Sequence, residues 1–313
     1  MARIGIVVVT YRSEETIEDC LRSCPSGGRV VVVDNASGDG TCDRVRRFPA
    51  VELLANRSNE GFAGAVNQGV AALDTEFVLV LNPDVSLLTP IEALCEAGSD
   101  LATGKLVDGS GVFQKGFSFR AFPRPITLIF EVLGINRLWP GNPVNRRYRC
   151  VGFDPERGGV VEQPAGAFLL FRREVWRKLG GLDTEFHPIW FEDVDFCKRA
   201  SDAGYRARYV PEVVAAHRGG ESIKNLNWRC REVYWYASLL RYASKHFRRR
   251  AFRGVSVAVI LSSALRGLIG VFRQRSFEAI KVYGRVIRLA VQSMVSGRVQ
   301  PPDVCPVLSK AVG

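Results

Sequence analysis

The sequence predicts an α/β protein built on an open, mostly parallel β-sheet with helices on both faces. Short, unbroken apolar runs recur along the first hundred residues, as in "IGIVVV" (4–9) and "RVVVVD" (29–34). Because these runs do not alternate with polar residues, they are typical of strands that are buried on both faces. Helical patterns separate the runs, as parallel strands require, and no internal repeat indicates a solenoid or a propeller.

The expected elements follow in order along the chain. In the first hundred residues, strands are expected at 4–9, 29–34, 51–56 and 76–82, and helices at 14–24, 40–48 and 61–73. A strand and then a helix that stops at a Gly pair are expected within 166–181. A helix that begins near the acidic cluster at 192–195 ends at Gly204, and a last strand covers 207–217.

Residues 110–160 have a different texture from the rest of the chain. The stretches "RAFPRP", "WPGNPVNRRYR" and "DPERGG" are rich in Pro, Arg, Gly and Asn. They flank one apolar segment, 126–139, which is expected to form a single helix. Because long irregular excursions from compact domains are usually functional loops or lids, we expect this one to serve the site.

Composition and motifs exclude several classes of protein. The chain has 313 residues, of which 47% are hydrophobic and 24% charged, which is a globular and not a disordered composition. No G-x-G-x-x-G follows the first strand and no G-K-[ST] occurs, so nicotinamide and P-loop phosphate sites lose support. The start does not resemble a secretory signal, and the eight cysteines include no C-x-x-C pair. Reduced thiols in a cytoplasmic protein are therefore expected.

The C-terminal third carries the positive charge. Residues 218–313 hold 18 Lys/Arg and 4 Asp/Glu, whereas residues 1–217 hold 25 and 28. The uncharged segment 254–265 is too short to span a bilayer and suits an interfacial or re-entrant helix, while a tight span is just possible if Arg266 is tolerated. A mostly basic stripe runs along 278–292. We expect a main domain at 1–222 and a basic helical region at 223–313 that lies on the anionic inner face of the cell membrane.

Two other interpretations of the C-terminal region stay open. It can form ordinary packing helices, or the contact of a homo-oligomer. Aromatic and basic residues alternate within 231–253, as in some nucleic-acid binders, but no DNA- or RNA-binding motif is present.

Polar residues at strand ends are the first candidates for a site, because ligands of open parallel sheets bind beyond the carboxyl ends of the strands. Thr10 and Tyr11 follow the first strand and Asp34 ends the second. Asp84 follows the fourth strand, where its carboxylate can bind a hard divalent cation, and His217 ends the last. Each also has a structural interpretation: a turn for Asp34 and Asp84, and an ordinary packed histidine for His217.

The stretch "WFEDVDFCKRA" (190–200) is the second candidate. It places Glu192, Asp193 and Asp195 among aromatic residues in a chain of net charge +11. Acids in a first helical turn can simply cap the helix and complement its dipole. Alternatively, a carboxylate surrounded by aromatic rings has a raised basicity and can act as a general base.

Six segments, taken in their order along residues 4–222, resemble the family 2 inverting glycosyltransferases of GT-A fold, and in particular their bacterial rhamnosyltransferase-like branch. The segments are "VVVTYRSEETIEDCLRS", "VVVDNASGDGT", "NEGFAGAVNQG", "LVLNPDV", "PAGAFLLFRREVWRKLGGLDTEFHPIWFEDVDFCKRASDAGYRARYVP" and "AAHRGGES". The set is specific to the family but not to one donor sugar.

The resemblance implies a role for each matching residue on the donor side. Thr10, Tyr11 and Asp34 would line the nucleotide pocket, and Asn59 and Asn67 would lie beside the donor. "NPD" stands where many relatives have D-x-D, so Asp84 and His217 would hold Mg²⁺ or Mn²⁺ on the diphosphate, whereas Asn82 replaces the first acid of that motif and would only line the donor site.

On the acceptor side, the resemblance implies that Asp193 is the general base and that Glu192 assists it. Trp190 and Gly166 would contact the acceptor, and Asp195 would cap the helix. The function implied is transfer of a sugar, with L-rhamnose from dTDP-rhamnose favoured, to a polysaccharide or polyprenyl-linked acceptor. Transfer of N-acetylglucosamine or galactofuranose, and a catalytically idle nucleotide-sugar-binding or scaffold protein, are the alternatives.

Overall fold

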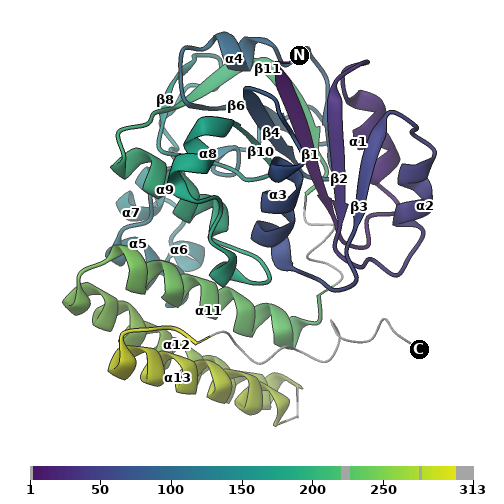
Figure 1. The fold of residues 1–313 in the computed structure, drawn as a ribbon. Helices are drawn as coiled ribbons and strands as arrows, with labels where there is room; N and C mark the ends of the chain where they lie inside the picture. The colour runs from purple at the N-terminus through teal and green to yellow at the C-terminus, as the bar shows by residue number, and fades with distance from the viewer. Residues whose placement is uncertain (1–2, 220–225, 275–276, 301–313) are drawn as a thin grey trace.

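A nine-stranded mixed sheet forms the centre of the protein (Figure 1). The computed structural model describes residues 3–219, 226–274 and 277–300. The strand order is β3-β2-β1-β4-β10-β6-β11-β5, and β8 also pairs with β11. The strands are β1 (Ile4–Thr10), β2 (Arg29–Asp34), β3 (Val51–Ala55), β4 (Phe77–Leu81), β5 (Val85–Leu87), β6 (Leu101–Val107), β8 (Gly159–Val161), β10 (Phe168–Arg172) and β11 (Ala207–His217).

The sheet is parallel only in the part formed by the first four expected strands. β1 pairs in parallel with β2 and β4, and β2 pairs in parallel with β3. β10 then runs antiparallel to both β4 and β6, and β11 runs parallel to β6 but antiparallel to β5 and β8. The α/β fold class is confirmed. The expected parallel arrangement is found in the half of the sheet formed by β3, β2, β1 and β4.

Helices cover both faces of the sheet, as the unbroken apolar strands predict. Alternate side chains of β1 enter separate cores, because successive residues of a strand point to opposite faces. Ile6 and Val8 pack with α1, α2 and α4, whereas Val7 and Val9 pack with α3, α8 and α9. These helices are α1 (Ile17–Ser23), α2 (Thr41–Arg46), α4 (Ala93–Glu96), α3 (Gly61–Ala71), α8 (Arg173–Leu179) and α9 (Glu192–Asp202).

The irregular excursion contains three short helices and one strand of a two-stranded sheet. The single helix expected at 126–139 is instead α5 (Pro125–Val132) followed by α6 (Ile135–Leu138). Gly134 separates them with a φ of 75°, a left-handed conformation that ends α5 and that glycine adopts without strain. The chain continues through α7 (Pro143–Tyr148), and β7 (Phe119–Arg120) pairs with β9 (Gln163–Pro164).

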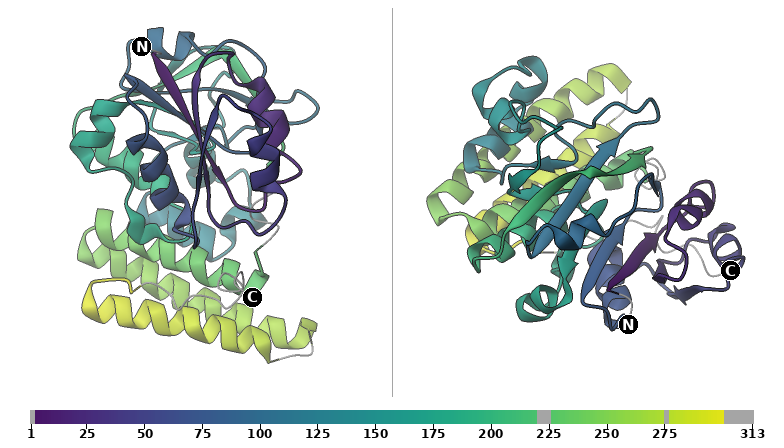
Figure 2. Two further views of the ribbon diagram at one scale, coloured as in Figure 1. Left: turned by 45° about the vertical axis from the view of Figure 1, so that its right-hand side comes forward. Right: turned by 90° about the horizontal axis from the view of Figure 1, so that it is seen from above.

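The C-terminal region forms a layer of three helices on one side of the sheet domain (Figures 1 and 2). These are α11 (Trp228–His246), α12 (Arg249–Gln274) and α13 (Glu278–Ser296). The apolar segment 254–265 is thus the middle of a 26-residue helix, and the amphipathic helix is where it was expected. The expected domain boundary between residues 222 and 223 lies outside the described residues.

The expectation of reduced thiols is wrong at one position. Among the described residues, six cysteines are free: Cys20, Cys24, Cys42, Cys95, Cys150 and Cys197. Cys230, in α11, takes part in a disulfide bond.

One buried carboxylate ties the helical layer to the sheet domain. Asp195, in α9, has no exposed surface. Its Oδ1 lies 2.7 Å from His246 Nε2 and 2.9 Å from Lys245 Nζ, both at the end of α11, and Arg199 Nε donates to its Oδ2 at 2.7 Å. Burial raises the pKa of Asp195, but these partners outweigh burial and lower it to about 2. The expectation that Asp195 is a helix cap is therefore replaced by a role in joining two helices.

Asp195→Asn should lower the free energy of unfolding by about 1.5–3 kcal/mol, because Arg199, Lys245 and His246 lose the charged acceptor that they share. Urea unfolding measures this, and Asp202→Asn, in the exposed pair with Lys198, is a control expected to cost about 0–1 kcal/mol.

The difference in free energy of unfolding between wild type and Asp195→Asn should depend on pH. A carboxylate with a depressed pKa stabilises the fold above the ordinary Asp pKa of about 4, and this contribution is lost as the pH falls toward about 2. The stability gap between wild type and Asp195→Asn should therefore shrink below pH 4. A gap that is unchanged down to pH 2 would contradict the ion-pair account.

Candidate active site

A cavity of about 470 Å³ lies beyond the carboxyl ends of β1, β4 and β11. The sheet supplies one wall, while α5 and α11 supply another through Leu128 and Trp235. Nine of the sequence-predicted residues line this cavity: Tyr11, Asn59, Asn82, Asp84, Gly166, Trp190, Glu192, Asp193 and His217. The structure thus brings the expected donor-side and acceptor-side residues to one place.

Three predicted residues do not line the cavity. Thr10 donates from Oγ1 to Asp34 Oδ1 at 2.7 Å, and Asp34 also accepts hydrogen bonds from the backbone and the hydroxyl of Ser37. Asp34 is thus engaged in the turn that follows β2. Asn67 accepts from Trp176 Nε1 at 2.9 Å and donates to the carbonyl of Leu182 at 2.8 Å, so it joins α3 to the segment after α8.

Asp84 and His217 face each other at one end of the cavity. His217 Nε2 lies 3.6 Å from Asp84 Oδ1, and the two residues are 3% and 7% exposed. Burial lowers the pKa of His217, and the charge of Asp84 opposes that shift. Among the described residues no group of three or more His, Cys, Asp or Glu gathers that could hold a metal alone. One carboxylate and one imidazole fit a divalent cation that takes its remaining ligands from a substrate diphosphate or water.

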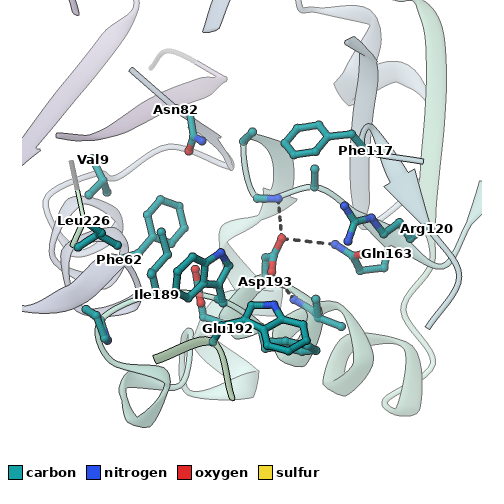
Figure 3. Close-up of a pocket in the computed structure, with 18 of the residues that line it drawn as sticks. Val9, Phe62, Asn82, Phe117, Arg120, Gln163, Ile189, Glu192, Asp193 and Leu226 are labelled. Atoms are coloured by element: carbon teal, nitrogen blue, oxygen red, sulfur yellow. Dashed lines mark hydrogen bonds between the residues drawn. The ribbon is translucent and has the colours of Figure 1, made fainter. Parts of the chain in front are cut away.

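Asp193 lies at the other side of the cavity, at the start of α9 (Figure 3). Its Oδ2 accepts from the backbone N–H of Gly166 at 2.8 Å and from Gln163 Nε2 at 3.4 Å. Its Oδ1 accepts from the backbone N–H of Val194 at 2.8 Å. Burial raises the pKa of Asp193, and the backbone hydrogen bonds from Gly166 and Val194 limit the rise.

Gly166 owes its identity to this contact. A Cβ at position 166 would lie 3.0 Å from Asp193 Cβ and 3.2 Å from Oδ2. A larger residue would push the carboxylate away from the backbone N–H that orients it.

Glu192 differs from Asp193 and Asp195 because it is buried with one carboxyl oxygen unpaired. It is 4% exposed, and its Oε2 has no hydrogen-bond partner. Burial, and then the negative charge of Asp193, raise the pKa of Glu192 well above its ordinary value. A protonated Glu192 offers a hydrogen-bond donor to whatever occupies the cavity.

The loop before α9 holds two aromatic residues in a conformation that L-residues rarely adopt. Trp190 and Phe191 have φ values of 80° and 69°. Such strain concentrates at sites where the fold fixes a side chain for function. Here both aromatic residues line the cavity beside the acids.

Sequence reasoning missed three polar residues of this wall: Arg120, Tyr148 and Gln163. Arg120 donates from Nη1 to the Tyr148 hydroxyl at 3.3 Å and from Nε to the carbonyl of Gly116 at 2.7 Å. All three line the cavity; Arg120 and Tyr148 belong to the excursion whose composition indicated a functional segment, and Gln163 follows it in β9. Arg120 pairs with Tyr148 and Gln163 with Asp193, partners 28 and 30 residues away, so no local sequence pattern would have identified them.

Comparison with known proteins gives a consistent result. The model of "Glycosyl transferase family 2" matches residues 5–151, and that of "Glycosyltransferase like family 2" matches residues 146–248. N-acetylglucosaminyl-diphospho-decaprenol L-rhamnosyltransferase of Mycobacterium tuberculosis is 33% identical over 244 residues, which cover 70% of this chain and 77% of that relative. Rhamnosyltransferase WbbL of Escherichia coli is 24% identical over 261 residues, covering 77% and 95%.

A solved structure with a similar fold is that of the mannosyltransferase PcManGT from Pyrobaculum calidifontis in complex with GDP-Man and Mn²⁺. Its TM-score is 0.50 at 17% identity, and the match covers 94% of this chain and 87% of that one. At this identity the likeness concerns the fold alone, which is the expected GT-A architecture.

Proposed function

The chain belongs to glycosyltransferase family 2, and on this premise we propose that it is an inverting, metal-dependent transferase of L-rhamnose from dTDP-rhamnose to a polyprenyl-diphosphate-linked glycan. The observation that carries the proposal is a single cavity that has Asp84 and His217, which can bind a cation, at one end and the oriented carboxylate of Asp193 at the other. The choice of rhamnose follows the relatives named above, and N-acetylglucosamine or galactofuranose is the second choice.

In the proposed reaction Asp193 is the general base. The acceptor hydroxyl oxygen bonds to the anomeric carbon, the bond from that carbon to the nucleoside diphosphate breaks, and the hydroxyl proton passes to the Asp193 carboxylate. Gly166 and Gln163 fix one of its oxygens, and the buried setting increases its basicity. A divalent cation held by Asp84 and His217 would neutralise charge on the departing diphosphate. Tyr11, Asn59 and Asn82 line the cavity for the donor, and Glu192, Trp190 and Arg120 for the acceptor.

Asp84→Asn should abolish Mn²⁺-dependent binding of dTDP or UDP, because it removes the only carboxylate of the proposed metal pair. Calorimetry with and without EDTA measures the binding, and circular dichroism checks that the fold is kept. Undiminished, EDTA-sensitive nucleotide binding would refute the assignment of Asp84.

Asp193→Asn should lower turnover by about 10²–10⁴-fold while donor affinity stays near wild type, because an amide cannot take the proton. Glu192→Gln is the matched control: it keeps a hydrogen-bond donor at a position that we take to be protonated, so a smaller loss is expected. Initial rates beside donor calorimetry test both. An active Asp193→Asn with an inactive Glu192→Gln would move the base to Glu192.

We further propose that the C-terminal region, residues 223–313, rests on the anionic inner face of the cell membrane, where a polyprenyl-linked acceptor resides. The described part of α12 exposes an apolar stripe at intervals of three or four residues, formed by Val257, Leu261, Leu265, Leu268 and Phe272. Three arginines, at 249, 250 and 253, lie at its start and suit anionic headgroups.

The packing of α12 favours an interfacial position over a span. Arg249–Phe272 is long and apolar enough to cross a membrane by length and composition, which is weak support for a span. However, Arg266 Nη2 donates to the carbonyl of Val132 in α5 at 3.3 Å, and Val255 and Val259 are buried in a core shared with α5, α11 and α13. A helix fixed along the protein in this way can present only its outer stripe to lipid.

Replacing Leu261 and Leu265 with Glu should abolish flotation with vesicles that contain phosphatidylglycerol, because it places charge in the apolar stripe. Val160→Glu, on the exposed strand β8, is the control and should float like wild type. Salt should weaken wild-type binding. Wild type that fails to bind vesicles would favour the packing or oligomer interpretation.

A further inference from the structure

Gln114 makes two hydrogen bonds to His217, one to each part of the residue. Its amide Nε2 donates to the backbone carbonyl of His217 at 2.8 Å, and its Oε1 lies 2.8 Å from His217 Nδ1. The ring of Phe117 stacks on the imidazole with centroids 4.7 Å apart and planes 19° apart. Residues of one short loop therefore hold the imidazole by its edge and by its face.

The backbone of Gln114 is itself fixed. Its N–H donates to the carbonyl of Leu106 in β6 at 2.9 Å. Its carbonyl accepts from the backbone N–H groups of Phe117 and Ser118, both at 3.1 Å. Gln114 is thus a rigid support and not a surface side chain that happens to reach the histidine.

These contacts decide which imidazole nitrogen carries the proton. A backbone carbonyl can only accept, so the end of the Gln114 amide that faces it must be the NH₂ group. The opposite end is then a carbonyl oxygen, and His217 Nδ1 must donate to it. In the neutral ring this leaves a lone pair on Nε2, and Nε2 is the atom that faces Asp84 Oδ1 at 3.6 Å.

Two lone-pair-bearing atoms that face each other in a buried place repel unless a positive charge lies between them. The same arrangement is suited to a metal ligand, because a histidine ligand usually donates its other N–H to a neighbouring acceptor. We propose that Gln114 is a positioning residue that locks His217 in the Nδ1–H form and aims Nε2 at a divalent cation shared with Asp84. This inference rests on the proposed function only in naming that cation.

The test compares Gln114→Met with Gln114→Glu. Methionine is close in size but has no oxygen, so His217 is expected to shift its proton to Nε2 and donate to Asp84. Glutamate loses the amide donor to the His217 carbonyl but keeps an acceptor for Nδ1–H, so it should keep the original form. Val112→Ala, at an exposed position of the same loop, is the control, and melting temperatures confirm that all variants fold.

The first readout is ¹⁵N NMR of the metal-free protein at pH 8, in which only three histidines contribute and His217→Gln identifies the signal. The second is the affinity for Mn²⁺ alone, measured by water-proton relaxation. Gln114→Met should lose the Nδ1–H form and bind Mn²⁺ about 10–100-fold more weakly, while Gln114→Glu and Val112→Ala stay within a few-fold of wild type.

The outcomes separate this inference from the function it serves. An Nδ1–H form that persists in Gln114→Met, or Mn²⁺ affinity unchanged by that substitution, would overturn the positioning role. Wild type that binds no Mn²⁺ would overturn the cation and with it the metal part of the proposed function, whatever the NMR result. Sugar transfer is not measured, so a wrong donor sugar affects neither readout.

Discussion

The buried carboxylate of Asp195 joins α9 to α11, and the position of Asp193, the proposed base, depends on these contacts. Asp193 lies two residues earlier in the same helical turn, so any rotation of α9 that moves one carboxylate moves the other. The contacts of Asp195 with Arg199, within α9, and with His246 and Lys245, in α11, fix that rotation. They thereby hold Asp193 against the backbone N–H of Gly166.

Helix geometry explains how three neighbouring acids acquire different properties. Successive residues of an α-helix point about 100° apart, so Glu192, Asp193 and Asp195 face different surroundings. Asp195 meets cations and has a depressed pKa. Burial raises the pKa of both Asp193 and Glu192, and backbone amides limit the rise at Asp193, whereas Oε2 of Glu192 has no hydrogen-bond partner. The cluster therefore supplies a structural anchor, a base and a neutral hydrogen-bonding group from four positions.

The parts of the fold that the sequence predicted are those with a local signal. The strands β1 to β4 are apolar runs between helical patterns, and they lie where expected. β6 was missed because Thr103, Gly104 and Lys105 interrupt its apolar run, although it pairs with β10 and β11 in the centre of the sheet. The helix expected at 126–139 is broken at Gly134, whose φ of 75° ends α5. The apolar composition of the segment does not show that this glycine adopts a left-handed conformation.

The same distinction applies to the site. Asp84, Asp193 and His217 lie next to or at the ends of regular elements and could be found by position. In contrast, Gln114 and Arg120 lie in the irregular excursion, Gln163 lies just after it, and their partners are far along the chain. The structure shows why that excursion is needed. Gln114 holds His217, and four residues later the carbonyl of Ser118 accepts from Ala165 N–H at 3.0 Å, next to Gly166. One short loop therefore contacts both ends of the cavity, so a change that shifts it would disturb the proposed metal pair and the proposed base together.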